Sequence, residues 1–111
     1  MASKIKMGKS SGNIFADLGF PDAESHLLKA EIMVEIMRLC EERSLTQLGV
    51  GKLLGISQPE VSRLFRGHFR EYSVERLIGF LTDFDRDVEI VVRTRKQSGK
   101  HGQITYVLAA A

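Results

Sequence analysis

The chain has 111 residues, a formal net charge of +2 and 43% hydrophobic residues. This length suits one domain with a modest core and excludes a large enzyme with a separate substrate domain. No apolar run approaches membrane-spanning length, and the lysines near the N-terminus are not followed by the apolar core of a signal peptide. A single cysteine, Cys40, excludes an internal disulfide. We therefore expect a cytoplasmic protein.

The N-terminal third is expected to contain a tail, a short helix and a long helix. Residues 1–12 are polar and lack periodicity, which predicts a flexible tail, and residues 13–20 resemble a short helix. Asp22 is a suitable N-cap for a long helix over residues 22–43. The apolar positions of this helix form a surface wider than one buried face needs. Deep burial of the whole helix and a surface for a partner are both open interpretations.

Residues 47–67 have the pattern of two short helices joined by a tight turn. Thr46 is a good N-cap for the first helix, and Gly55 suits the point where that helix stops and the chain reverses. Ser57 and Glu60 have the spacing of a capping box at the start of the second helix. The apolar stripe of the second helix consists of Val61, Leu64 and Phe65. This arrangement is the helix-turn-helix, which places one helix in the major groove of DNA.

Two glycines lie inside the first of these helices. We expect another helix to cross the first helix at Gly51, since a small residue permits close contact. Gly49 lies two positions before it. Each interior glycine costs roughly 1 kcal/mol relative to alanine. The pattern therefore predicts that the first helix is the least stable part of the DNA reader, the name used here for the helix-turn-helix of residues 47–67.

The residues left facing outward form hydrogen bonds or carry positive charge. Between residues 44 and 70 there are four basic residues and one acidic residue, so the positive charge of the chain gathers at this motif. The predicted base-reading residues are Ser57, Gln58, Pro59, Ser62 and Arg63. The predicted phosphate-binding residues are Thr46, Gln47, Arg66, His68 and Arg70. The alternative is that these are only solvated side chains on helix faces, which would not explain the turn pattern.

After residues 68–72, expected to be a loop, Ser73 should cap a further helix over residues 73–84. Beyond Asp85 the apolar period changes from that of a helix to that of a strand, with glycines for a turn between two segments. Two strands alone are marginal in water. They should either cover the helical core or pair with a second copy. The residues predicted for dimerisation are Val88, Ile90, Val92, Ile104 and Tyr106.

No pattern in the sequence predicts catalysis, a metal site or a cofactor. Residues 49–52 lack the spacing of a phosphate loop, and the three histidines are isolated from one another and from any cysteine pair. Asp83, Asp85 and Asp87 alternate, but the glycine and the final glutamate of a calcium loop are missing. We expect neither an enzyme nor a metal or cofactor protein.

The motif resembles that of a known family. Gln47, Gly51, Gly55, Val61 and Leu64 have the spacing of the signature of Cro/repressor-like, or XRE-type, helix-turn-helix domains. Residues 13–93 are similar to the subfamily that contains HigA-type antitoxins. The resemblance implies a mainly α fold, a bundle of about five helices with a short C-terminal β-hairpin or β-strand element. It divides the chain into a tail (1–12), a DNA-binding domain (13–86) and a dimerising β element (87–111).

The same resemblance implies a function. Relatives of this type are bacterial antitoxins that neutralise an RNA-cleaving toxin of the RelE/HigB type and repress their own promoter. It favours a homodimer on a palindromic double-stranded operator, in the cytoplasm and associated with the nucleoid. One alternative is a stand-alone or phage-type repressor without a toxin. The other is a protein-interaction module that does not bind DNA.

Overall fold

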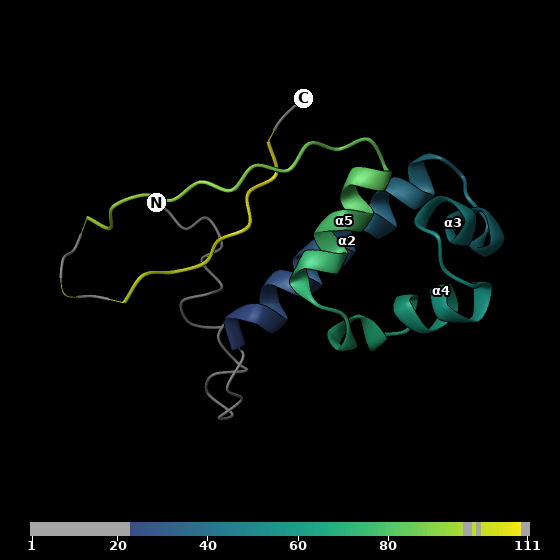
Figure 1. Cartoon of the computed structure of the whole chain (residues 1–111), viewed down its shortest axis with the longest axis horizontal. Coiled ribbons are helices and arrows are strands. Elements are labelled where there is room, and N and C mark those ends of the chain that lie inside the picture. Colours follow the sequence, from purple (N-terminus) through teal and green to yellow (C-terminus); the bar gives the residue numbers. More distant parts are fainter. Residues whose placement is uncertain (1–22, 97–98, 100, 110–111) are drawn as a thin grey trace. The chain divides into compact units, whose positions relative to one another are not determined.

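The computed structural model describes residues 23–96, 99 and 101–109. In this part of the chain the α-helices are α2 (Ala23–Glu42), α3 (Gln47–Leu54), α4 (Gln58–Phe65) and α5 (Val74–Asp83), with a 3-10 helix, η3 (His68–Glu71), before α5 (Figure 1). The mainly helical fold is thus confirmed. The predicted tail and the short helix at 13–20 lie outside the described residues. None of the described helices is long and apolar enough to cross a membrane.

The core lies in the compact unit Lys29–Val88, which contains the helix-turn-helix. It is built from apolar side chains of α2, α3, α4 and α5, and from Phe84 directly after α5, that are nearly or fully inaccessible to solvent. The largest of them are Phe84, Ile32, Ile36, Leu39, Leu64, Leu77, Val50 and Val61. Their positions on α2 and α5 follow the helical period, so each helix buries one face.

Helix α2 buries only part of its wide apolar surface. Ile32, Ile36 and Leu39 lie in the core, whereas Val34 is 67% exposed and Met37 is 45% exposed. The helix ends at Glu42. Of the two interpretations of this surface, burial of the whole helix is therefore wrong for the described residues.

The residue after α2 fastens its end to the end of α5. The Arg43 guanidinium donates a hydrogen bond from Nη2 to the Phe84 carbonyl oxygen over 2.9 Å. It also lies 5.2 Å from the centroid of the Phe84 ring, which is itself fully buried. A cation over an aromatic face adds attraction to this hydrogen bond. The contact closes one end of the core and holds the first and last helices of the unit together.

The turn between α3 and α4 is built on a close backbone contact. Gly55 adopts a left-handed conformation with φ 75°, and its N–H and that of Ile56 both donate to the Gly51 carbonyl oxygen, over 2.7 and 3.0 Å. A Cβ atom on Gly51 would lie 2.6 Å from the Ile56 carbonyl oxygen. Only glycine fits at this position without a backbone shift.

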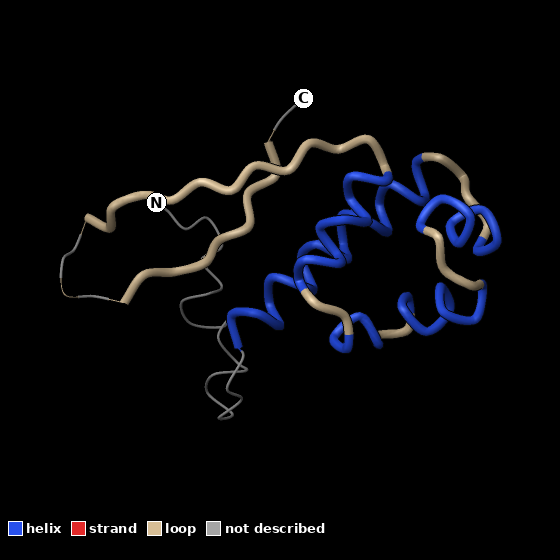
Figure 2. The backbone as a smooth tube through the Cα atoms, in the orientation of Figure 1, coloured by secondary structure: helices blue, strands red, loops and turns tan. Residues whose placement is uncertain are grey.

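The segment after α5 contains no strand in its described residues, 86–96, 99 and 101–109, and Figure 2 draws them as loop. Its apolar side chains are open to solvent, with Ile90 83% and Val92 91% exposed. The C-terminal β element therefore stays a prediction. A strand needs a partner for its backbone groups, so this segment can form one only by pairing with another segment or another chain.

The two glycines of α3 should respond oppositely to alanine. Gly51→Ala is expected to lower the free energy of unfolding by roughly 1–3 kcal/mol, because the new Cβ would overpack the turn. Gly49→Ala should raise it by about 0.5–1 kcal/mol, because alanine is the better helix former. Its Cβ would find no contact closer than 3.5 Å.

Urea unfolding of the two variants beside the wild type measures both changes. If the two substitutions shifted the free energy of unfolding in the same direction, the close contact at Gly51 would not govern the turn.

Candidate nucleic-acid interface

Helix α4 begins at a side-chain cap, as the sequence predicts. The Glu60 N–H donates to the Ser57 hydroxyl oxygen over 3.3 Å, and Pro59 lies in the first turn, where no N–H is required. The other half of the predicted capping box does not form. The Glu60 carboxylate instead accepts a hydrogen bond from the Tyr72 hydroxyl over 2.7 Å. A tertiary contact has thus replaced a local one.

The outward face of α4 carries the residues predicted to read bases. Val61 and Leu64 are buried, so the opposite side of the helix faces solvent. Gln58, Pro59 and Arg63 are exposed, and Ser62 is half-buried. Ser57, the cap, is exposed as well. The structure therefore brings all five predicted base-reading residues to one short helix and its start.

The predicted phosphate-binding residues lie at the start of α3, directly after α4 and in η3. Thr46 caps α3, where its hydroxyl accepts a hydrogen bond from the Gly49 N–H over 3.1 Å, and Gln47 is exposed in the first turn. Arg66 follows α4 directly, and His68 and Arg70 belong to η3; all three are exposed. Both sets of residues belong to the unit Lys29–Val88.

An aromatic and charged cluster that the sequence does not predict joins α4 to α5. Tyr72 packs edge-on against Phe80, with ring centroids 5.8 Å apart, and the Arg76 guanidinium lies 5.0 Å from the Tyr72 ring centroid. Burial, together with the hydrogen bond to the Glu60 carboxylate, raises the pKa of Tyr72 to about 12. Tyr72 therefore stays a neutral hydrogen-bond donor at physiological pH. The cluster ties Glu60 of α4 to Tyr72 and, through the Tyr72 ring, to Arg76 and Phe80 of α5.

A second cluster lies beside the outward face. The Arg63 Nη2 atom is 3.2 Å from one oxygen of the Glu71 carboxylate, and the His68 Nδ1 atom is 3.3 Å from the other. All three side chains are about half exposed. Two of the predicted DNA-binding residues thus share one acidic neighbour, which counting charges along the sequence did not reveal.

The predicted dimerisation residues follow α5. Val88 ends the unit Lys29–Val88, and the others, Ile90, Val92, Ile104 and Tyr106, belong to the second compact unit. Ile104 is 60% exposed and Tyr106 is half-buried.

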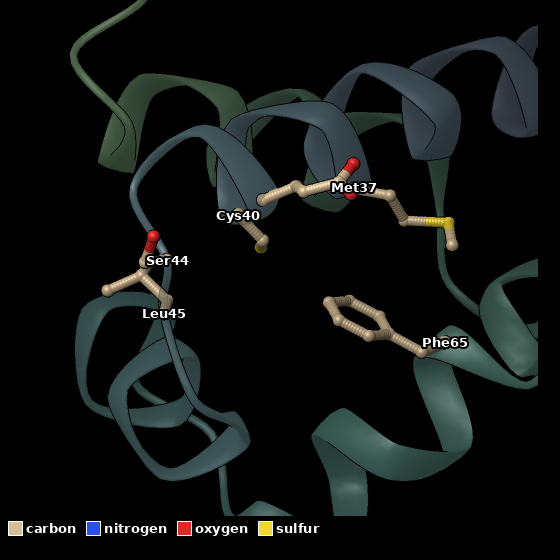
Figure 3. A pocket seen from close by; sticks show the side chains of 6 residues that line it. Met37, Cys40, Ser44, Leu45 and Phe65 are labelled. Carbon is tan, nitrogen blue, oxygen red and sulfur yellow. The ribbon is translucent and has the colours of Figure 1, made fainter.

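A pocket of about 610 Å³ lies between the end of α2, the connection to α3 and the end of α4 (Figure 3). It is lined mainly by apolar groups, among them Met37, Leu45 and Phe65, with the Glu41 and Ser44 side chains also lining it. Cys40, which is nearly fully buried, also lines it, and burial raises the pKa of its thiol. Such a thiol is inert, which fits a packing role. In the described part of the chain no three histidine, cysteine or acidic residues gather as metal ligands.

Comparisons with known proteins agree with this geometry. A family model described as a helix-turn-helix domain matches residues 14–93. A solved structure named as a candidate XRE family transcriptional regulator superposes with a TM-score of 0.74 and 36% sequence identity, over 80% of this chain and 100% of that chain. The chain belongs to the XRE family of helix-turn-helix proteins. No curated protein matches it.

Membership of the XRE family makes the α3–α4 unit a DNA-binding element and the protein a transcription regulator. Within this family, the second helix of the motif enters the major groove, and the first lies across the backbone. In this chain these are α4 and α3.

Proposed function

We propose that this XRE-family regulator is a sequence-specific repressor that binds a palindromic operator as a homodimer, and that it is the antitoxin of a HigBA/RelE-type pair. The observation that carries the DNA-binding part is the outward face of α4. Apart from Pro59, the residues predicted to read bases there are polar or cationic, whereas Val61 and Leu64 on the opposite side are buried and fix the helix to the core.

The chemistry of the face supports a division of roles. The Gln58 amide can pair with adenine, the Arg63 guanidinium with guanine, and the Ser57 and Ser62 hydroxyls with several acceptors. Pro59 offers an apolar contact for a thymine methyl group. These five residues are assigned to base reading.

Phosphate binding is assigned to the residues around this face. Thr46 and Gln47 stand at the N-terminus of α3, where backbone N–H groups and the helix dipole favour an anion. Arg66 and Arg70 follow α4 in the chain and supply positive charge, and the exposed His68 ring between them can form a hydrogen bond. Such contacts hold the protein in register on the duplex without reading sequence.

One α4 helix covers only a few base pairs, so a second copy is required for a long site. We assign dimerisation to residues 87–111, through Val88, Ile90, Val92, Ile104 and Tyr106. The exposed apolar side chains of this segment support it, because pairing with a second copy would satisfy the backbone groups of a strand edge and bring such side chains into cross-strand contact. Two α4 helices related by a twofold axis would enter successive major grooves about 34 Å apart.

The antitoxin part of the proposal is supported by the similarity of residues 13–93 to HigA-type proteins and by the surface of α2. Val34 and Met37 are exposed on that helix, three residues apart on one face. An apolar strip of this kind suits a protein partner. The proposed partner is a toxin of the RelE/HigB type, in the bacterial cytoplasm close to the nucleoid.

Arg63 and Arg66 should have different roles in DNA binding. Arg63→Ala is expected to weaken binding of the cognate duplex by about 1–3 kcal/mol and to relax the base preference at one position. Arg66→Ala should weaken binding to all duplexes and make the salt dependence shallower by roughly one ion. Fluorescence anisotropy on cognate and random duplexes over a salt series measures both effects.

Arg86→Ala, which removes the same charge after α5, is the matched control and should leave base preference unchanged. Equal losses on cognate and random DNA for the Arg63 and Arg66 variants would contradict the assigned roles.

Removal of the residues after Asp87 should produce a monomer and lower the affinity for a palindromic duplex, because each copy would then bind its half-site alone. Sedimentation gives the oligomeric state, and anisotropy gives the affinity. In the full chain, Val92→Asp should act in the same direction. A truncated protein that remained dimeric would refute the assignment of the interface.

Co-expression with the adjacent reading frame, followed by affinity purification, tests the antitoxin role. The expected result is a small basic protein that co-purifies, and whose retention falls when Val34 and Met37 are both replaced by Asp. Glu75→Gln, on α5, serves as a matched surface control. Salt-dependent DNA binding without any co-purifying protein would instead identify a stand-alone or phage-type repressor.

A further inference from the structure

Glu71 is the acidic residue that contacts the proposed reader. Its two carboxylate oxygens face Arg63, at 3.2 Å, and His68, at 3.3 Å. Arg63 is assigned to base reading and His68 to phosphate binding, so one carboxylate engages a member of each group.

The backbone holds Glu71 in this place. Gly67, with φ 105°, turns the chain after α4, and η3 then runs from His68 to Glu71. Lys29 Nζ, on α2, donates to the Arg70 carbonyl oxygen over 3.0 Å, one residue before Glu71. On the other side, the Tyr72 hydroxyl is tied to Glu60. Contacts to α2 and α4 therefore flank Glu71, so its position beside Arg63 does not depend on the ion pair itself.

A carboxylate in this position changes what the arginine offers to DNA. Paired with Glu71, the Arg63 guanidinium contributes almost no net charge toward a phosphate, and the carboxylate repels phosphate oxygens at short range. The pair is exposed, so it is weak and opens at little cost. A guanidinium leaves it readily for a bidentate contact with a base edge, but gains less from a single phosphate.

We propose that Glu71 is a specificity-determining residue of the reader: it withholds Arg63 and His68 from non-cognate DNA, so that Arg63 is released where a matching base edge is present. Specificity is a difference between two affinities, and a built-in repulsive element lowers the wrong one. This inference rests on the proposed base-reading role of Arg63.

The test compares Glu71→Gln with Glu75→Gln in the full-length protein. Both remove one negative charge from an exposed side chain, but Glu75 has no ion pair or hydrogen bond from its side chain to any described residue. Two duplexes serve as probes: a random-sequence duplex and the duplex that the wild type enriches from a random library. Anisotropy titrations over a salt series give the two affinities and their salt slopes, and thermal unfolding checks that each variant is folded.

Glu71→Gln is expected to tighten binding of the random duplex about fivefold, with a salt slope steeper by roughly one ion. Binding of the enriched duplex should change by less than about twofold, so the ratio of the two affinities falls; Glu75→Gln should leave this ratio unchanged. In an Arg63→Ala background, Glu71→Gln should have a much smaller effect, because residues in contact are not additive.

An equal change on both duplexes, or the same change for both glutamate variants, would overturn the inference while leaving the proposed function intact. Full additivity of the Arg63 and Glu71 substitutions would overturn it too. If the wild type showed no salt-dependent binding of either duplex, the proposed function would fall, and the role of Glu71 with it.

Discussion

The geometry of the DNA reader depends on the close approach between the backbone of α3 and the turn that follows. The Gly51 carbonyl oxygen accepts two N–H groups, from Gly55 and Ile56, and the space beside the Gly51 Cα is filled by the Ile56 carbonyl group. The chain can therefore reverse within three residues and begin α4 at Gln58. Val61 then packs against Gly51, since a Cβ there would lie 3.6 Å from its side chain. The direction of α4, and so of every side chain on its outward face, follows from this contact.

Where an interaction joins residues that are close in the chain, the sequence alone predicts the local structure. The caps at Thr46, Ser57 and Ser73 each accept a hydrogen bond from an N–H three residues later, so their spacing alone predicts where α3, α4 and α5 begin. The predicted low stability of α3 stays a prediction, and the structure gives its two glycines different roles. Gly49 carries the usual helix penalty of glycine, but Gly51 is required by packing, and its small size is a condition of the fold.

Where an interaction joins residues that are far apart in the chain, the sequence alone does not predict which residues meet. The capping box predicted that Glu60 would turn back to its own helix start, but Tyr72, twelve residues on, binds its carboxylate. Residues 68–71, predicted as loop, form η3, and no pattern indicated that this turn would bring Glu71 to Arg63. The alternation of apolar residues after α5 predicts strands, yet it carries no information about what they pair with. A helix forms its hydrogen bonds within itself, whereas a strand depends on another segment.

The charge counted along the chain also differs from the charge that surrounds a residue in the structure. Counted along the chain, residues 44–70 contain four basic residues and one acidic residue, which describes a strongly cationic reader. The count stops one residue before Glu71, which lies against Arg63. Of the four basic residues, Arg66, Arg70 and Lys52 have no acidic partner among the described residues. Paired and unpaired cations therefore suit two different tasks. Unpaired positive charge attracts any duplex, whereas a guanidinium that must leave its carboxylate favours a contact of similar geometry, such as a bidentate hydrogen bond to a base edge.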